Sequence, residues 1–444
     1  MDRNAGRTPD AEGAIRMTRD VYAQLRELLG DDAVSRDSRG MPRVAPASTE
    51  QTASICALAH AQKWTVRVEG RGSWQLSDAP ADFALTMRAL QSVVAVQPAD
   101  LVATVEAGVA FDALRRALAE QHMWLALDPP GRPERSVGSV IASATAGPLR
   151  LGFGGVRDHV LGCTVVTGDG RVIRAGGRVV KNVAGFDLTR LQVGGFGGFG
   201  IITELHLRLR AIPATDRTFV SRSGRDALTS AARDLTTARV SLQALELFSP
   251  ALAAESEWVL AARLLGTAEG TEAESQRLAQ LAPELAWREI PADRVGAFWH
   301  LSARAVLGGA VTMRLGVLQG GLDDAMDLVG ATLDEGLVAA GAGPSGGMRW
   351  SGEATADQLN TLRRNFAARE IPLTLERAPW NVRRAVGHFG AYREGVGQVV
   401  ERLQETFDPG NVLRGAMGAG EAEKKSGGAE KKSGEADETG GLTP

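Results

Sequence analysis

The stretch of sequence that decides the fold runs from Leu127 to Leu209 and reads LDPPGRPERSVGSVIASATAGPLRLGFGGVRDHVLGCTVVTGDGRVIRAGGRVVKNVAGFDLTRLQVGGFGGFGIITELHLRL. Glycine and other small residues are denser here than turns alone require. Within it, residues 159–177 predict a β-hairpin, because a Gly-Asp-Gly sequence at 168–170 separates two β-branched runs and allows the positive φ angles of a tight turn. The last segment, 202–209, alternates leucine with polar residues, which predicts a half-buried strand.

Upstream, helices and strands alternate without the regular spacing of βαβ units, which favours an α+β fold. Ser48 and Gln51 stand at capping-box spacing before an apolar face, so a helix is expected to begin there. A strand at 64–68 runs directly into a glycine-bearing turn, EGRGSWQL, at 69–76. Two further strands and a helix are expected at 93–96, 101–109 and 111–121.

Downstream of Pro213 the glycine clusters thin out, and Ala/Leu-rich helical stretches alternate with short strands such as 240–248 and 257–266. This change predicts a second domain. A helix ending in a turn is expected at 396–415. Both ends of the chain lack apolar periodicity, and the C-terminal end repeats AEKKSG, so we expect both to be disordered.

The composition excludes several classes of partner. With a formal net charge of -3 and a pI of about 6.2, the chain has no strong field to attract nucleic acid or an acidic membrane surface. Cys56 and Cys163 are too few for an iron–sulfur cluster, which takes four thiolates. The N-terminal residues contain no apolar signal region, and no later run approaches the roughly 18–20 apolar residues of a membrane span, so a cytoplasmic location is expected.

Two glycine-bearing loops indicate a dinucleotide ligand. A pyrophosphate needs several backbone amides brought close without intervening side chains, and glycine permits this approach. Alone, GRGSW at 70–74 is more often a plain turn. A flexible hairpin is the alternative reading for the later glycines, Gly195, Gly197, Gly198 and Gly200. Together, GRGSW, VGS at 137–139 and the GGFGGFGIITE sequence that follows predict dinucleotide binding.

These motifs, with DPPG, SVGSVIASATAG, VVKNVAGFDL and a late FDPGNVL, resemble the FAD-linked oxidases with a vanillyl-alcohol-oxidase-like (PCMH-type) flavin domain. The resemblance covers roughly residues 46–212 well and the second domain loosely. It implies an α+β fold, with a PCMH-type FAD-binding domain of two α+β subdomains and a smaller α+β cap domain. The expected order is a disordered N-terminus at 1–15, the FAD-binding domain at 16–212, the cap or substrate-type domain at 213–395, a closing helix and turn at 396–417, and a disordered charged tail at 418–444.

The resemblance also implies a cofactor and its site. FAD is expected to bind noncovalently, because the first loop lacks the histidine and the second the cysteine that tether flavin in some relatives. The pyrophosphate would be held by Gly70, Arg71, Gly72, Ser73 and Trp74. The pyrophosphate and flavin ring would be lined by Pro129, Gly138, Ser139, Ala142 and Ser143. Ile201 or Ile202 would contact the adenine end.

Within that family, VVKNVAGFDL and GPLRLGFGGVRD are most similar to the small flavin subunits of bacterial glycolate oxidases. This implies an FAD-binding subunit that oxidises glycolate to glyoxylate together with a larger catalytic flavin subunit and an iron–sulfur subunit. Any membrane association would come through those partners. The alternatives are a stand-alone FAD-dependent oxidoreductase acting on another 2-hydroxy acid or alcohol, and a non-catalytic structural flavoprotein subunit.

The sequence identifies no catalytic residue. Relatives that oxidise D-2-hydroxy acids carry a histidine-rich element near HxGDGNxH, which this chain lacks, and its six histidines include no pair at metal-ligand spacing, so no metal is expected. His300 is the most plausible pocket histidine of the second domain, but helix packing is favoured for it. For His159 a structural hydrogen bond is favoured, and His206 is expected to point outward into solvent.

Four cationic residues each allow both a functional and a purely structural role. Arg314, Arg349 and Arg377 are candidates to bind a substrate carboxylate, but surface ion pairs are the default in a chain this rich in arginine. Lys181 is either a point charge beside phosphate or reduced flavin, or an exposed turn lysine.

Overall fold

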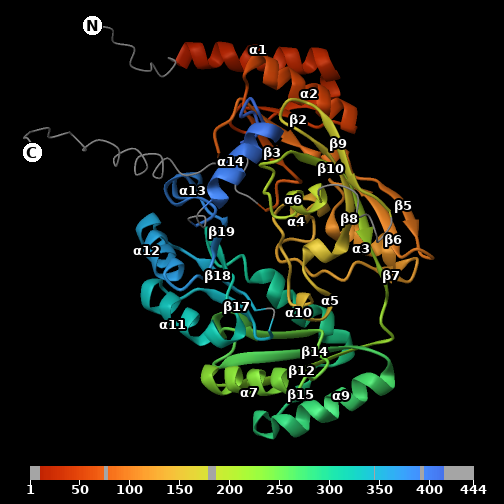
Figure 1. Cartoon of the computed structure of the whole chain (residues 1–444), viewed down its shortest axis with the longest axis vertical. Coiled ribbons are helices and arrows are strands. Elements are labelled where there is room, and N and C mark those ends of the chain that lie inside the picture. The colour runs from red at the N-terminus through yellow and green to blue at the C-terminus, as the bar shows by residue number, and fades with distance from the viewer. Residues whose placement is uncertain (1–10, 75–78, 179–186, 345, 391–394, 415–444) are drawn as a thin grey trace, which may run out of the picture.

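The computed structural model describes residues 11–74, 79–178, 187–344, 346–390 and 395–414 (Figure 1). Its strands form four sheets, of four, five, two and eight strands. The α+β prediction is confirmed. Strands up to Ala211 belong to the first three sheets and those from Thr215 onward to the fourth, which is compatible with the boundary predicted after residue 212. None of the described helices is long and apolar enough to cross a membrane.

The first sheet has the order β1-β2-β4-β3 and carries two helices. Its elements are α1 (Ala11–Leu29), β1 (Val34–Arg36), β2 (Pro42–Val44), α2 (Thr49–Gln62), β3 (Val66–Glu69) and β4 (Phe83–Thr86). Ser48 caps α2 as predicted, accepting a hydrogen bond from the backbone N–H of Gln51. We predicted that structure begins near Arg16, but α1 starts at Ala11, and the core anchors this helix through Val21 and Leu25.

The second sheet is antiparallel, in the order β5-β6-β10-β8-β9, and includes the stretch that decides the fold. Its elements, with three associated helices, are β5 (Val93–Gln97), β6 (Val102–Glu106), α3 (Phe111–Ala119), α4 (Val137–Ala142), α5 (Arg150–Phe153), β8 (Val160–Val166), β9 (Val172–Gly176) and β10 (Ile201–Arg208). The predicted hairpin is confirmed as β8 and β9, with Gly170 at φ +86° in its turn. The half-buried strand is confirmed as β10, which places its leucines in the core.

The fourth sheet is antiparallel, in the order β15-β12-β14-β13-β17-β18-β16-β19. Its strands are β12 (Thr215–Ser223), β13 (Ala244–Phe248), β14 (Trp258–Gly266), β15 (Arg288–Glu289), β16 (Val311–Leu315), β17 (Leu337–Gly341), β18 (Met348–Gly352) and β19 (Leu373–Arg377). Four helices pack on one face: α7 (Arg225–Thr237), α9 (Ala268–Leu281), α11 (Leu322–Thr332) and α12 (Ala356–Ala367). Because side chains alternate along a strand, Arg314 lies on the opposite face from Met313 and Leu315, which face the helices.

That opposite face packs against the part of the chain that precedes β12, called here the flavin-type part. Arg314 Nη1 donates to the carbonyl oxygen of Ala144 at 2.9 Å, and the backbone N–H of Gly152 donates to the carbonyl oxygen of Gln243 at 3.1 Å. Charged side chains of the sheet therefore lie in the contact between the two parts of the chain.

The end of the described chain returns to the first sheet. After α13 (Trp380–Val386) and α14 (Val396–Phe407), the chain reaches β3 through residues 412–414. The backbone N–H of Val66 donates to the carbonyl oxygen of Val412 at 2.7 Å, and the backbone N–H of Arg414 donates to the carbonyl oxygen of Val66 at 2.9 Å. The Asp408 carboxylate accepts from the N–H groups of Val412 and Leu413 at 2.8 and 2.9 Å, which fixes this turn. The C-terminal segment thus closes one side of the site described next.

Candidate functional site

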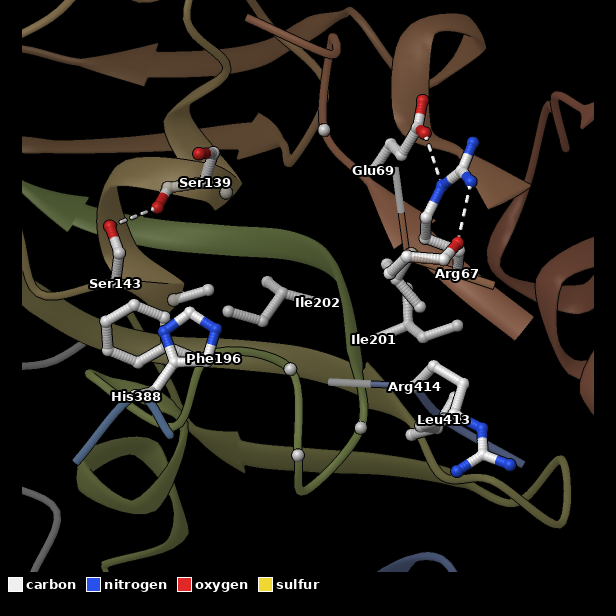
Figure 2. A pocket seen from close by; sticks show the side chains of 18 of the residues that line it. Arg67, Glu69, Ser139, Ser143, Phe196, Ile201, Ile202, His388, Leu413 and Arg414 are labelled. Carbon is white, nitrogen blue, oxygen red and sulfur yellow. Dashed lines mark hydrogen bonds and ion pairs between the residues drawn. The ribbon is translucent and has the colours of Figure 1, made fainter. Parts of the chain in front are cut away.

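A cavity of about 760 Å³ lies between the first two sheets and the C-terminal segment. Figure 2 shows Ser139, Ser143, Phe196 and His388 gathered at one end, and Arg67, Glu69 and Arg414 at the other. Ile201 and Ile202 lie between the two ends. The cavity is therefore elongated, with residues of α4 at one end and residues of β3 at the other.

The first glycine loop leaves β3 and is held tightly. A Cβ atom added at Gly70 would overlap the Ser136 side chain, and the Gly70 carbonyl oxygen accepts hydrogen bonds from Met87 N at 3.1 Å and Thr86 Oγ1 at 3.0 Å. Gly72 has φ +72°, a conformation that side chains rarely adopt. This loop needs glycine at both positions.

The second wall is the short helix α4. Ser136 caps it, accepting a hydrogen bond from the N–H of Ser139 at 3.3 Å. A Cβ atom at Gly138 would lie 2.8 Å from Ala107 Cβ, so glycine lets the helix approach β6 closely. Ser139 and Ser143 consequently reach the cavity.

Eleven of the twelve predicted cofactor-binding residues line this cavity. The exception is Pro129, which is not among its lining residues. Of the later glycines, Gly197, Gly198 and Gly200 line the cavity and Gly195 does not. The structure brings the two loops together around one space, and the role of each residue in binding remains a prediction.

The β3 end of the cavity contains a buried ion pair. Arg67 Nε lies 2.9 Å from Glu69 Oε1, and Arg43 pairs with the other oxygen of the same carboxylate. Arg67 Nη1 also donates to the carbonyl oxygen of Ala79 at 3.0 Å. Arg67 and Glu69 are therefore paired and held in place at this end.

His388 lines the opposite end, and our sequence analysis did not single it out. It is buried, and its ring centroid lies 5.4 Å from that of Phe196. Its Nδ1 atom lies 2.7 Å from the Leu375 carbonyl oxygen, which only accepts hydrogen bonds, so Nδ1 carries the proton. Burial lowers the pKa of His388 to about 4. The ring is therefore neutral near pH 7, with Nε2 as the unprotonated nitrogen.

The three histidines weighed from the sequence lie elsewhere. His300 is exposed on α10 (Val295–Arg304), whose buried face is formed by Val295, Trp299 and Ser302, so neither the favoured helix packing nor the pocket role is correct. His206 is half-buried, with Nδ1 3.1 Å from Thr104 Oγ1, so the prediction that it is solvated was also wrong. The cross-strand pairing of β10 with β6 brings that threonine opposite it.

His159 is buried away from the cavity, and burial lowers its pKa to about 4. Its Nε2 atom has no hydrogen-bond partner among the described residues. A backbone hydrogen bond with Gly154 acts on the ring and opposes the lowering of its pKa, in line with the predicted structural hydrogen bond.

The arginine candidates are not surface residues, contrary to the default expectation. Arg349 Nε lies 2.9 Å and Arg314 Nε 3.3 Å from the Glu376 carboxylate, which is fully buried. Arg377 makes longer hydrogen bonds to the carbonyl oxygens of Val306 and Gly309. The cross-strand pairing of β16 with β18 places Arg314 opposite Arg349, which the sequence alone does not reveal. Lys181 lies outside the described residues.

The cavity fits FAD on three observations. Its volume falls in the range of roughly 300–1,000 Å³ that is usual for ligand sites. Its glycines at 70 and 138 permit close backbone approach. Trp74 Nε1, a buried donor in the wall, has no hydrogen-bond partner among the described residues, so an acceptor on the cofactor would satisfy it.

Comparison with known proteins agrees. Residues 42–176 match the family described as the FAD binding domain. These residues therefore form an FAD-binding domain of the kind found in FAD-linked oxidases. FAD is thereby confirmed as the cofactor.

The chain is similar in sequence to two subunits of glycolate oxidases. The glycolate oxidase subunit GlcE of Escherichia coli (strain K12) is 38% identical over 130 residues, which are 29% of this chain and 37% of that protein. The glycolate oxidase subunit GlcD of Bacillus subtilis (strain 168) is 28% identical over 224 residues, 46% and 48% of the two chains. A D-2-hydroxyglutarate dehydrogenase of Xanthomonas citri pv. viticola is 31% identical over 172 residues, which are 38% of this chain and 36% of that protein. The matches thus span less than half the length of these relatives.

Solved structures show the same fold. A p-cresol methylhydroxylase with substrate bound has a TM-score of 0.72 at 15% identity, covering 90% of this chain and 96% of that one. An alkyldihydroxyacetonephosphate synthase has a TM-score of 0.67 at 14% identity, and the match covers 88% of this chain and 85% of that one. The predicted PCMH-type fold is confirmed.

Proposed function

We propose that this chain is the FAD-binding subunit of a glycolate-oxidising complex and that its own cavity takes part in oxidising a small 2-hydroxy acid. The observation that carries the proposal is the cavity that unites both glycine loops with the neutral imidazole of His388. The similarity to glycolate oxidase subunits supports the choice of substrate.

Oxidation of a hydroxy acid needs a group that takes the hydroxyl proton. His388 suits this role, because its Nδ1–H is held by the Leu375 carbonyl oxygen and the other nitrogen is free of a proton. The Leu375 carbonyl oxygen would also stabilise the imidazolium ring that forms when Nε2 accepts the proton. FAD, when bound, supplies the acceptor for the hydride.

A carboxylate substrate also needs a cationic group. Arg383 and Arg384 line the cavity on α13, one turn before His388. Arg383 is buried and donates through Nε to the Ala378 carbonyl oxygen at 2.9 Å, which orients its guanidinium group. We assign the orientation of the substrate carboxylate to this pair of arginines.

The complex is proposed from the relatives and from the cysteine count. Both cysteines are buried, and burial raises the pKa of each thiol to about 12, so neither is suited to bind a metal as thiolate. An iron–sulfur cluster that carries electrons onward would then belong to another subunit, alongside a larger catalytic flavin subunit. FAD would be bound noncovalently here.

The test uses the purified chain reconstituted with FAD. Glycolate is added anaerobically to the chain alone and to the chain mixed with the larger flavin subunit from the same organism. Bleaching of the oxidised-flavin absorption in the chain alone would mean that its own site oxidises glycolate. Bleaching only in the mixture would mean that oxidation requires the partner, and no bleaching in either would exclude glycolate.

A second candidate function is a stand-alone oxidoreductase for another 2-hydroxy acid. The similarity to a D-2-hydroxyglutarate dehydrogenase and to a mitochondrial D-lactate dehydrogenase of Arabidopsis thaliana favours it. The same anaerobic experiment with D-lactate and D-2-hydroxyglutarate separates the two functions, because the stand-alone enzyme would be bleached by one of these acids without a partner.

A further inference from the structure

Arg135 is the largest fully buried side chain among the described residues, with 1% of its surface exposed. It lies directly behind the cavity wall. Its Nη2 atom donates to Ser143 Oγ at 2.6 Å and to Thr145 Oγ1 at 2.9 Å, and Nη1 donates to the Pro130 carbonyl oxygen at 3.0 Å. Nε donates to Ser139 Oγ at 3.3 Å. Since Ser139 and Ser143 themselves line the cavity, only one layer of side chains separates the guanidinium group from it.

All of these acceptors are neutral hydroxyl or carbonyl oxygens. Among the residues that the structure describes, no carboxylate lies within ion-pair distance of Arg135. Glu376 is the acid whose charge acts on Arg135, but its carboxylate is already shared by Arg314 and Arg349. The buried guanidinium group of Arg135 and the half-buried ones of Arg314 and Arg349 therefore face the Glu376 carboxylate, which leaves an excess of positive charge behind the wall.

Such an excess is costly in the empty protein and favours negative charge nearby. Removing an unpaired ion from water costs several kcal/mol even after relaxation, and attraction across a protein interior is stronger than in water. A hydride delivers two electrons and one proton to bound FAD, so reduction adds one negative charge unless a second proton follows. Oxidised FAD does not carry that additional charge.

We propose that Arg135 is a fixed positive charge behind the cavity wall that favours the reduced form of bound FAD. It acts on the cofactor through the wall, with Ser139 and Ser143 in between, and not by contact. The proposal rests on FAD as the cofactor and is independent of which hydroxy acid is oxidised.

The test is the midpoint potential of the bound FAD, measured by equilibrium reductive titration against a reference dye. Arg135→Met keeps the length and removes the charge, and we expect reduced FAD to lose about tenfold in stability relative to oxidised FAD, which is about 30 mV for a two-electron couple. Arg135→Lys keeps the charge and should retain most of the potential. The matched control is Arg217→Met, because Arg217 is paired with Glu289 and Glu272 at the far edge of the eight-stranded sheet and should leave the potential unchanged.

Equal shifts in the Met and Lys variants would overturn the proposal, because packing and not charge would then set the potential. An unchanged potential in Arg135→Met would overturn it as well. A loss of affinity for oxidised FAD without a change in potential would place the effect at the pyrophosphate instead of the ring. If the Met variant does not fold, Arg135→Gln, which keeps hydrogen-bond donors without the charge, is measured in its place.

Discussion

The guanidinium group of Arg135 stacks on the indole ring of Trp74, with the Cζ atom 3.5 Å from the ring centroid. This contact joins the first glycine loop to the segment that leads into α4. A buried cation over an aromatic ring is stabilising by about 2 kcal/mol. The two cofactor loops, which lie far apart in sequence, are therefore held to each other by one stacked pair.

The stacked pair predicts the behaviour of Trp74→Phe. Phenylalanine keeps a ring under Arg135 and removes the buried N–H that has no partner among the described residues. We expect the free energy of unfolding of the FAD-free protein to change by less than about 1.5 kcal/mol. The affinity for FAD should fall by about two- to tenfold, the value of one hydrogen bond of about 0.5–1.5 kcal/mol. Urea unfolding and fluorescence titration measure the two quantities, and an unchanged affinity would show that Nε1 does not bind the cofactor.

Gly138→Ala should damage the cofactor site more than the fold. The added methyl group would meet Ala107 Cβ at 2.8 Å and the Ala107 carbonyl oxygen at 2.9 Å, so α4 must move away from β6. We expect the affinity for FAD to fall at least about tenfold, since a shift of α4 displaces Ser139 and Ser143 together, and tenfold corresponds to only about 1.4 kcal/mol.

The matched control is Gly296→Ala on α10, where nothing lies within 4 Å of the added carbon. Alanine in this first turn of α10 should not destabilise the protein and should leave FAD binding unchanged. If the two variants bound FAD equally well, the close approach of α4 would not matter for the cofactor.

His388→Asn should retain FAD and lose its reduction by the substrate. Burial lowers the pKa of this histidine to about 4, so its proton-accepting form predominates from about pH 5 upward. For the wild type, we expect the rate of anaerobic FAD reduction to rise as pH rises through about 4. Above that range, titration of His388 should cause no further change in the rate. Stopped-flow absorbance measures the rate, and a variant that reduces FAD at the wild-type rate would exclude His388 as the base.

Two buried acids predict how stability depends on pH. Burial raises the pKa of Glu246 to about 8 and that of Asp128 to about 7. Because the folded state binds protons that the unfolded state releases near its ordinary pKa, folded stability falls as pH rises from about 5 to about 8. Glu246→Gln should therefore have a higher Tm than the wild type at about pH 9 and a similar Tm at about pH 5.

Thermal melts across this range measure the effect. Glu284→Gln serves as the control, because that glutamate is exposed and should leave the slope of Tm against pH unchanged. Identical pH dependence of Glu246→Gln and the wild type would mean that Glu246 is not protonated in the folded protein.

The glycine loops were predictable from the sequence because their chemistry is local. GRGSW and VGS each need small residues for close backbone approach, and the structure places them at one cavity. The hairpin at 168–170 and the alternating strand β10 are local patterns as well, and both were confirmed. Such features depend on neighbours in the sequence.

His388 was not predictable for the same reason. Its role depends on Leu375 across a loop and on Phe196 from the flavin-type part, and no spacing in the sequence relates these residues. Helix packing was favoured for His300, but the rotation of α10 buries Trp299 and leaves His300 in solvent. The pairing of Arg314 and Arg349 with Glu376 likewise depends on strand order in the eight-stranded sheet.

The first measurement to make is the absorption spectrum of the purified chain before and after anaerobic addition of glycolate, because it tests whether this cavity binds FAD and oxidises the substrate. We expect an oxidised-flavin spectrum. Acid precipitation should release the flavin, because it is not covalently bound. Glycolate should bleach the flavin absorption of the wild type and not that of His388→Asn. A wild-type protein that stays colourless even after FAD is added would contradict the assignment of this cavity as the cofactor site.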